Sequence, residues 1–482
     1  MKSFLLFVLL GVLPFTFLHA DEYHNINGFF GERASAFAGA FTAVADDPSG
    51  GYYNPAGLSF ATANSISISA STYNKFEKTF VDALGPGQNL ALKSETYMPN
   101  FIGALREITE NTNLGMSLIS PVTQAINQSN QVVLPLTLPE VAEAKAESTQ
   151  QKSILVGGPS LSYALKDNVS IGASLLFFSD YSLSSNNFTI SLLNKTNVVN
   201  SERDERRTRG FLPILGIMYM PTEKVSLGAS FRKTFVTSGV RRLSESLIQS
   251  GNNDLVFNSL RTHNGSAANS SLGVFLGPPV TAEIPEVYEA RGGLAWFANT
   301  KLQFSFDIIY TSSYRKYQRN LEVAPLERAA LVNPPEIESL SREATSNFAG
   351  GLEFFITPNL AIKFGYFTNY ANNKNISWVE SALATSARGN LASGIVPLYG
   401  ESFSEQGFIG YRIPQLQERE RTEHVDLFGY TLGISSSFHD SSLSIILIWE
   451  KGQGGGSGNS DVGSSKIIYD SLNLYMAAST MH

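Results

Sequence analysis

The sequence contains no cysteine among its 482 residues, and only 16% of the residues are charged. Without cysteine there is no disulfide framework, no thiolate metal cluster, no cysteine nucleophile and no cysteine for an N-terminal lipid anchor. The net charge of −7 argues against a basic face for nucleic acid, so no nucleic-acid partner is expected. After residue 20 no apolar run reaches about 18 residues, which excludes further membrane-spanning helices from the expected fold.

Residues 1–20 have the pattern of a secretory signal peptide. Lys2 supplies the positive start, an apolar stretch follows from Phe4 to Phe17, and Ala20 is a small residue at which cleavage can occur. An uncleaved membrane anchor is the alternative, but the apolar stretch is short for a span. We therefore expect residues 1–20 to be removed and the mature chain to lie beyond the inner membrane.

Several segments alternate apolar and polar residues as β-strands do. In KLQFSFDIIYT (residues 301–311) the even-numbered residues are apolar and the odd-numbered ones are polar, apart from Ile309. Residues 225–235 and 360–366 show the same period. A soluble β-sandwich also alternates, so this pattern alone does not choose between a sandwich and a membrane barrel.

The spacing of the turns favours the barrel. Short polar turns alternate with long polar segments, which is the asymmetry between the two rims of an outer-membrane barrel. The short turns are expected at Thr109–Thr112, Lys166–Asn168, Pro221–Lys224, Asn299–Thr300, Pro358–Asn359 and His439–Ser442. The long loops are expected at Gln124–Gln151, Leu183–Thr208, Ser238–Pro285, Arg315–Glu343, Ala371–Glu423 and Gly452–Ser465, with a short helix over Pro139–Thr149.

The predicted fold class is therefore all-β: a transmembrane antiparallel β-barrel of about 14 strands. The strands are expected at Ser65–Tyr73, Tyr97–Leu105, Asn113–Pro121, Ser153–Leu165, Val169–Ser182, Arg209–Met220, Val225–Thr237, Glu286–Ala298, Lys301–Tyr314, Thr345–Thr357, Leu360–Tyr370, His424–Phe438, Leu443–Lys451 and Ile467–Ala478. Such a barrel would lie in the bacterial outer membrane as a multi-pass protein in contact with membrane lipid.

The segment before the first strand does not alternate. Residues 31–60 read GERASAFAGAFTAVADDPSGGYYNPAGLSF, which is rich in small residues and turn formers that permit close backbone packing. A flexible tail is the alternative, but it would carry more charge and fewer aromatic residues. We expect residues 21–62 to form an N-terminal hatch, or plug, inside the lumen, and residues 63–482 to form the barrel with long extracellular loops.

The hatch sequence resembles the FadL/TodX family of outer-membrane transporters for long-chain fatty acids and other hydrophobic compounds. The resemblance rests on Gly31–Ala34, Ala38–Ala40, Val44–Asp47 and, above all, Asn54-Pro55-Ala56-Gly57-Leu58. It continues more loosely through Ile284–Gly293. The sequence departs from many outer-membrane barrels because it ends on Met481-His482 rather than on an aromatic residue. Either the insertion signal differs, or Tyr475 serves instead.

The resemblance implies passive transport of a long-chain fatty acid or another hydrophobic small molecule. It assigns gating to the hatch motif Asn54, Pro55, Ala56 and Gly57, and implies lateral exit through the barrel wall. The alternative is an adhesin or receptor that acts through its long loops, with little transport. A monomer is expected.

Strand alternation predicts which charged residues face the lumen: Arg232, Arg291, Lys363, Asp307 and Glu353. A fatty-acid carboxylate needs a cation or hydrogen-bond donors because its desolvation is costly. These residues are therefore candidates to bind a ligand carboxylate or, equally, to pair with one another and with hatch carboxylates and hold the plug.

Enzyme signals are weak. The six histidines form no His-x-x-x-His pair and no cluster with metal-ligand spacing. The glycine-rich stretch Gly452–Gly458 lacks the Lys-Ser/Thr ending of a phosphate loop, and no Gly-x-Ser-x-Gly elbow occurs. We expect no catalytic residues, no metal and no cofactor.

Overall fold

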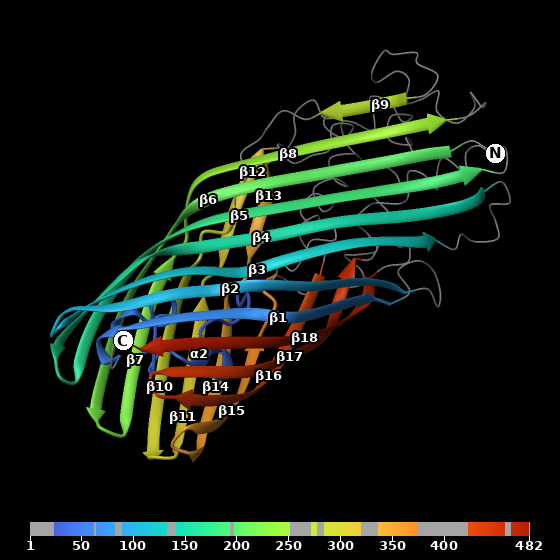
Figure 1. Cartoon of the computed structure of the whole chain (residues 1–482). Helices are drawn as coiled ribbons and strands as arrows, with labels where there is room; N and C mark the ends of the chain where they lie inside the picture. Colours follow the sequence, from blue (N-terminus) through green and yellow to red (C-terminus); the bar gives the residue numbers. More distant parts are fainter. Residues whose placement is uncertain are drawn as a thin grey trace.

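The chain folds into a closed antiparallel β-barrel (Figure 1). The structure is a computed structural model that describes residues 24–61, 64–81, 89–132, 141–192, 197–250, 271–276, 284–319, 336–373, 423–457 and 464–481. The expected signal peptide and the longest expected loops lie largely outside these residues.

One sheet of sixteen strands forms the wall, and pairing between β5 and β6 closes it. Strand β8 continues β7 after a break at Thr234, and β9 adds to the edge of β8, so the barrel itself has 14 strands, which confirms the prediction. The strands of this sheet are β1 (Ser65–Phe80), β2 (Leu90–Thr109), β3 (Thr112–Val132), β4 (Val141–Lys166), β5 (Val169–Leu192), β6 (Asn197–Thr222), β7 (Val225–Lys233), β8 (Phe235–Ser250), β9 (Ser271–Leu276), β10 (Tyr288–Asn299), β11 (Leu302–Thr311), β14 (Thr345–Thr357), β15 (Leu360–Asn369), β16 (Glu423–Phe438), β17 (Ser441–Ser457) and β18 (Ser464–Met481). A separate hairpin of β12 (Tyr314–Arg319) and β13 (Glu336–Arg342) extends β11 and β14.

All six short turns lie where the sequence predicts them, between consecutive paired strands on one rim. The chain enters and leaves the barrel at the same rim, because Ser65 at the start of β1 pairs with Met481 at the end of β18. This rim is the short-turn rim, and the opposite rim carries the long connections.

The strands extend much further toward the loop rim than the sequence predicts. Much of the expected loops Gln124–Gln151 and Leu183–Thr208 is strand, in β3, β4, β5 and β6. The expected helix over Pro139–Thr149 is wrong for residues 141–149, which belong to β4 and pair with both β3 and β5. Backbone pairing on both sides outweighs the helix preference of the local alanines.

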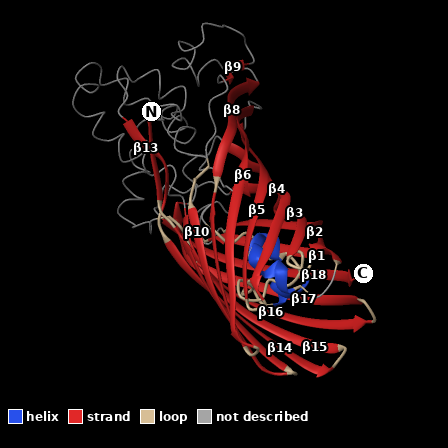
Figure 2. Ribbon diagram, turned by 90° about the vertical axis from the view of Figure 1, so that its left-hand side faces the viewer, coloured by secondary structure: helices blue, strands red, loops and turns tan. Residues whose placement is uncertain are grey.

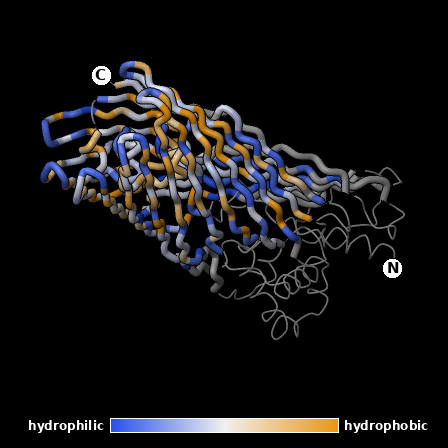
Figure 3. The backbone as a smooth tube through the Cα atoms, turned by 90° about the horizontal axis from the view of Figure 1, so that it is seen from below, coloured by the Kyte–Doolittle hydropathy of each residue, from blue (hydrophilic) through white to orange (hydrophobic). Residues whose placement is uncertain are grey.

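Alternation places apolar side chains on the outside of the barrel. Along β11, Gln303, Ser305 and Asp307 face inward and are buried, whereas Phe306, Ile308 and Tyr310 face outward and are almost half exposed. Outward apolar residues recur around the wall, and Figure 3 shows the apolar segments in the middle of the strands and polar ones at the turns. A closed barrel pairs all of its strands, so the backbone hydrogen bonds of the wall are satisfied within the sheet. Its outward apolar side chains form a band, the apolar belt, that suits contact with lipid.

Residues 24–61 lie inside the ring of strands (Figure 2). We call them the inner segment. They form α2 (Glu32–Ala36), α3 (Gly50–Tyr53) and the 3-10 helix η1 (Pro55–Phe60), and they contribute much of the main apolar cluster of the molecule. The residue limits of a hatch domain remain a prediction.

Candidate functional site: the inner segment and the lumen wall

Asn54 anchors the turn between α3 and η1. Its side-chain amide donates to the carbonyls of Thr42 (2.8 Å) and of Ile217 on β6 (3.1 Å), while its oxygen accepts the Ala56 amide (3.2 Å). Pro55 begins η1, where its missing N–H is not needed. Asn54 is fully buried, so this side chain connects two parts of the inner segment to the wall.

A repeated pattern of small residues on the wall receives the inner segment. Ser170 donates to the Ala56 carbonyl (2.7 Å) and Ser174 to the Gly51 carbonyl (2.7 Å), both from β5. Between these serines Gly172 lies so close to the Pro55–Ala56 backbone that a Cβ would overlap it. Ser230 on β7 donates to the Tyr53 carbonyl (2.8 Å) in the same way.

The sequence contains this pattern as a repeat, VSIGAS at 169–174 and VSLGAS at 225–230. The sequence alone indicated two strands that leave the same rim. It did not indicate that the serines and glycines of the repeat contact the backbone of the inner segment. Inward-facing Ser-x-Gly-x-Ser is the signal that would have indicated a docking surface for another backbone.

The opposite wall contacts α2 through charge. Arg33 pairs with Glu353 on β14 (3.1 Å) and with Asp46 of the inner segment (2.5 Å). Lys363 on β15 lies 3.3 Å from Glu353 and 3.7 Å from Glu32. Glu32 also accepts hydrogen bonds from Ser442, Ser444 and Ser479 of β17 and β18. Glu353 and Lys363 therefore face the lumen, and both pair with the inner segment.

Asp307 on β11 is fully buried and accepts the backbone N–H groups of Phe41 (3.1 Å) and Thr42 (3.0 Å). A carboxylate that accepts two backbone donors fixes the bend of the inner segment against this strand.

Arg232 and Arg291 lie on the neighbouring strands β7 and β10 and share one carboxylate, Glu289. Their contacts with it are 2.6 Å and 2.5 Å, respectively. The Arg232 guanidinium lies over the Tyr52 ring (4.3 Å to the centroid), and that of Arg291 over Tyr53 (5.4 Å). The Nη1 atom of Arg232 is buried and has no hydrogen-bond partner among the described residues. Two guanidinium groups thus share the carboxylate of Glu289, and Arg291 also interacts electrostatically with the carboxyl group of Asp307.

The role of the five predicted lumen charges stays a proposal, although the structure places all of them inside and buried. Sequence reasoning missed Glu289, which lies directly opposite Arg232 across the β7–β10 ladder. It expected hatch carboxylates as partners without singling out Glu32, and it missed Arg33, since these contacts depend on the path of the inner segment.

Asp47 and Arg33 are two groups of the inner segment whose pKa values are displaced in the folded protein. Burial raises the pKa of Asp47 to about 6, although hydrogen bonds from Ser49 act in the opposite direction. Burial alone lowers the pKa of Arg33, but the carboxylates of Asp46 and Glu353 outweigh it and raise that pKa above its usual range. Arg33 is therefore a fixed cation, whereas Asp47 titrates in a mildly acidic range.

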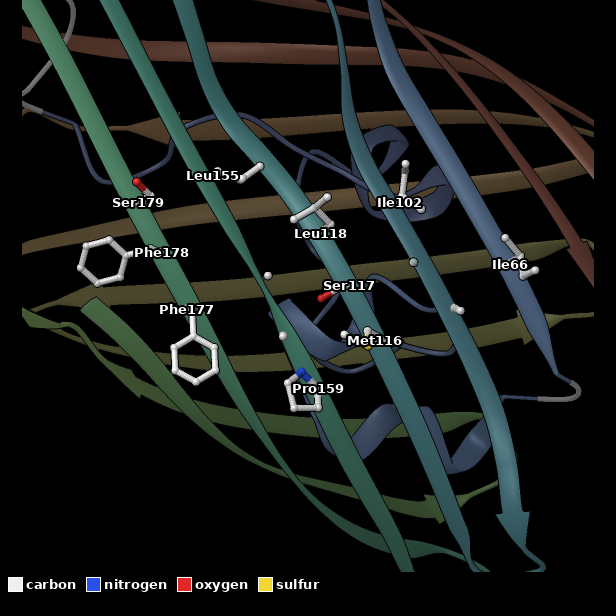
Figure 4. Close-up of a pocket in the computed structure, with 14 residues that line it drawn as sticks. Ile66, Ile102, Met116, Ser117, Leu118, Leu155, Pro159, Phe177, Phe178 and Ser179 are labelled. Carbon is white, nitrogen blue, oxygen red and sulfur yellow. The ribbon is translucent and has the colours of Figure 1, made fainter. Parts of the chain in front are cut away.

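Part of the wall from β2 to β5 carries apolar side chains on both faces. Inside, Phe101, Ile119, Val156, Leu176 and Phe178 are buried in the cluster that includes the aromatic residues of the inner segment. The outside of the same strands carries a pocket of about 680 Å³ (Figure 4). Its apolar lining includes Ile66, Ile102, Met116, Leu118, Leu155 and Phe177.

The pairing of this wall is interrupted beside the pocket. Between β2 and β3 the ladder ends at Phe101 and Ile119, and the strands diverge beyond it toward the loop rim (Figure 1). Between β4 and β5 it skips Gly158 and Pro159, because proline has no N–H to donate. This is therefore a locally weakened part of the wall.

Tyr475 on β18 faces the lumen. It is fully buried, and its hydroxyl contacts Ser69 and accepts the Gly31 amide (3.1 Å). It presents no aromatic ring to the lipid.

Among the described residues, no helix is long and apolar enough to cross a membrane. Within the same residues, no three His, Asp or Glu side chains are grouped closely enough to hold a metal ion.

The fold defines a β-barrel of the kind that spans bacterial outer membranes, with its N-terminal segment folded inside. No protein-family model and no curated protein matches the sequence. Solved structures do. A FadL homologue of Pseudomonas aeruginosa is similar with a TM-score of 0.59 and 13% identity, over 96% of this chain and 100% of the other. The toluene transporter TodX of P. putida is similar with a TM-score of 0.52 and 13% identity, over 95% of this chain and 99% of the other. The fold implied by the sequence resemblance is thereby confirmed.

Proposed function

We propose that this protein carries hydrophobic small molecules, such as long-chain fatty acids, passively across the outer membrane. The proposal rests on the inner segment, which lies in the lumen beside a part of the wall that carries apolar side chains on both faces. The description of one similar structure as a toluene transporter supports a hydrophobic cargo. The inner segment acts as the hatch in this proposal.

The charges of the lumen suggest where a carboxylate would bind. Lys363 already lies between two carboxylates, Glu32 and Glu353. Arg232 and Arg291 share the carboxylate of Glu289, and the Nη1 group of Arg232 has no hydrogen-bond acceptor among the described residues. A fatty-acid carboxylate would therefore bind at Arg232, with its chain along the apolar wall.

Exit would be lateral, between β2 and β3. The apolar inner cluster and the apolar outer pocket lie on the two faces of the same strands, next to the point where β2 and β3 separate. A hydrophobic molecule on this route never has to cross a water-filled pore.

The hatch would open by a shift around Asn54-Pro55-Ala56. This turn is held to the wall by single hydrogen bonds from neutral side chains, whereas α2 is held by ion pairs. The turn is therefore the weaker attachment.

The experiment is uptake of oleate into proteoliposomes by the Asn54→Ala/Pro55→Ala variant. We expect uptake to fall by about tenfold, because an ordered shift of this turn depends on its fixed backbone and on its side-chain hydrogen bonds, and the variant lacks both. A heat-modifiable gel shift checks that the barrel still assembles. Unchanged uptake by an assembled variant rules out the gating role of this turn.

Loop deletion separates this proposal from the adhesin or receptor alternative, because an adhesin would lose binding and keep any uptake. The long loops on which that alternative depends lie largely outside the described residues.

A further inference from the structure

A band of arginines borders the apolar belt on the outside of β6 and β8. Arg203, Arg207 and Arg209 are exposed on β6, and Arg242 is exposed on β8. Their exposed fractions include 51% for Arg203 and 62% for Arg207. We call these four residues the outer arginine patch.

The positive charge of the outer arginine patch is only partly neutralised by acidic side chains on the same face of the sheet. Glu205 contacts Arg207 (2.8 Å) and Arg203 (3.6 Å) and lies opposite Arg242 in the ladder. Among the outward side chains that the structure describes on β6 and β8, Glu205 is the one acidic residue beside these four arginines. On the inner face at the same height, by contrast, Arg241 and Arg206 are both paired with Asp204.

The position of the patch matches the edge of a membrane. Outward residues of β6 are apolar from Tyr219 to Phe211, eight steps that cover about 26 Å of strand or about 20 Å of depth at a tilt of about 40°. Arg209 is the next outward residue, close to the edge of an apolar band about 25 Å tall.

Aromatic side chains lie at the same edge, as expected of a lipid interface. Phe211 stacks on Phe235 (4.9 Å between centroids), and Lys233 lies over the Phe235 ring (4.5 Å). Further out, Arg207 lies over Tyr181 (5.2 Å). Aromatic rings followed by basic side chains are typical anchors at the boundary between acyl chains and head groups.

We infer that the outer arginine patch binds the phosphate of an anionic lipid in the leaflet on the side of the long connections. Its acyl chains would lie on the apolar surface of β5, β6 and β7, and its phosphate would contact the arginines. A guanidinium matches a phosphate in shape and charge, and a basic side chain near an anionic lipid surface strengthens the attraction. This inference does not depend on transport.

The test measures phosphatidylglycerol bound to the barrel by native mass spectrometry after extraction from phosphatidylcholine nanodiscs that contain it. In the Arg203→Gln/Arg207→Gln/Arg209→Gln/Arg242→Gln variant, binding should fall about fivefold for each arginine removed. The matched Arg→Lys variant at the same four positions keeps the charge and should retain most of the lipid. Glu205→Gln should retain more than the wild type, because it removes the internal counter-ion.

The inference is overturned if the four-glutamine variant binds as much phosphatidylglycerol as the wild type, or if Glu205→Gln binds less. It is also overturned if inorganic phosphate alone stabilises the barrel against heat as much as the lipid does, because the site would then recognise free phosphate. High salt should weaken lipid binding by the wild type.

Discussion

Lys363 shows how strongly single residues hold the inner segment. Its ammonium group is buried between Glu353 and Glu32, which lie on different parts of the chain. Removing one member of a buried ionic group leaves charges without compensation.

We predict that Lys363→Met lowers the free energy of unfolding by about 3 kcal/mol, measured by urea denaturation in lipid vesicles. Lys301→Met, in an exposed turn, is the control and should change it by less than about 0.5 kcal/mol. Adding Glu353→Gln to Lys363→Met should restore part of the loss. Equal free energies of unfolding for Lys363→Met and the wild type would show that the ionic contacts of Lys363 with Glu353 and Glu32 do not stabilise the fold.

Asp47 gives the inner segment a dependence on pH. Its pKa is about 6 in the folded protein, against 3.8 for an ordinary aspartate. The folded state therefore binds the proton more tightly, so the group contributes stability below about pH 4 that is lost as the pH rises through 6. We predict that hydrogen exchange of the inner segment, corrected for intrinsic rates, becomes faster between pH 4 and about 7. Asp47→Asn should flatten this rise, and an unchanged slope in the variant would assign it to another group.

Residue parity predicted correctly that Arg232, Arg291, Asp307, Glu353 and Lys363 face inward, because alternation is a local property of a strand. Pairing among these residues and with hatch carboxylates was a stated alternative, and Lys363 contacts both Glu353 and Glu32, but the other individual partners could not be predicted. The Arg232–Glu289 pair depends on the register between β7 and β10, which are separated by a long connection, and the Glu353–Arg33 pair depends on how the inner segment runs.

Among the elements, the strands were predicted well at the short-turn rim and poorly at the loop rim. Strand β4 runs from Val141 to Lys166, whereas alternation indicated only Ser153–Leu165. Outside the membrane both faces of a strand meet water, so the apolar period that reveals a strand disappears. The extra length is specified by pairing with neighbours, which a local pattern does not contain.

The weakened wall between β2 and β5 allows a test of lateral exit. Ala104 is an exposed, outward residue of the pocket lining on β2. We predict that Ala104→Trp lowers oleate uptake about fivefold, because the indole fills the space through which a ligand would leave. Ala229→Trp on the outside of β7 is the matched control and should transport normally. Equal uptake by the two variants would exclude this wall as the exit.

At the scale of the whole molecule, the lumen has two unlike sides. Ion pairs attach α2 to β14 and β15, whereas hydroxyl groups of β5 and β7 attach the backbone of α3 and η1. The apolar wall and its outer pocket lie on the side of α3 and η1. Transport by this route therefore requires α3 and η1 to move while α2 stays in place.

The most direct measurement uses a disulfide to hold the moving part. A Cβ added at Gly51 of α3 lies 3.3 Å from Cβ of Ser160 on β4, close to the separation that a disulfide needs. Because the chain has no cysteine, Gly51→Cys/Ser160→Cys adds the only thiols. The control Ala36→Cys/Gly433→Cys has the same separation, 3.3 Å, and ties α2 to β16.

Oleate uptake is measured for both pairs under oxidising conditions and again after reduction. We expect that oxidation of Gly51→Cys/Ser160→Cys stops uptake, that reduction restores it, and that the Ala36→Cys/Gly433→Cys disulfide has little effect. Full uptake by the oxidised Gly51→Cys/Ser160→Cys barrel, with the disulfide verified by mass spectrometry, would show that α3 does not have to move for transport.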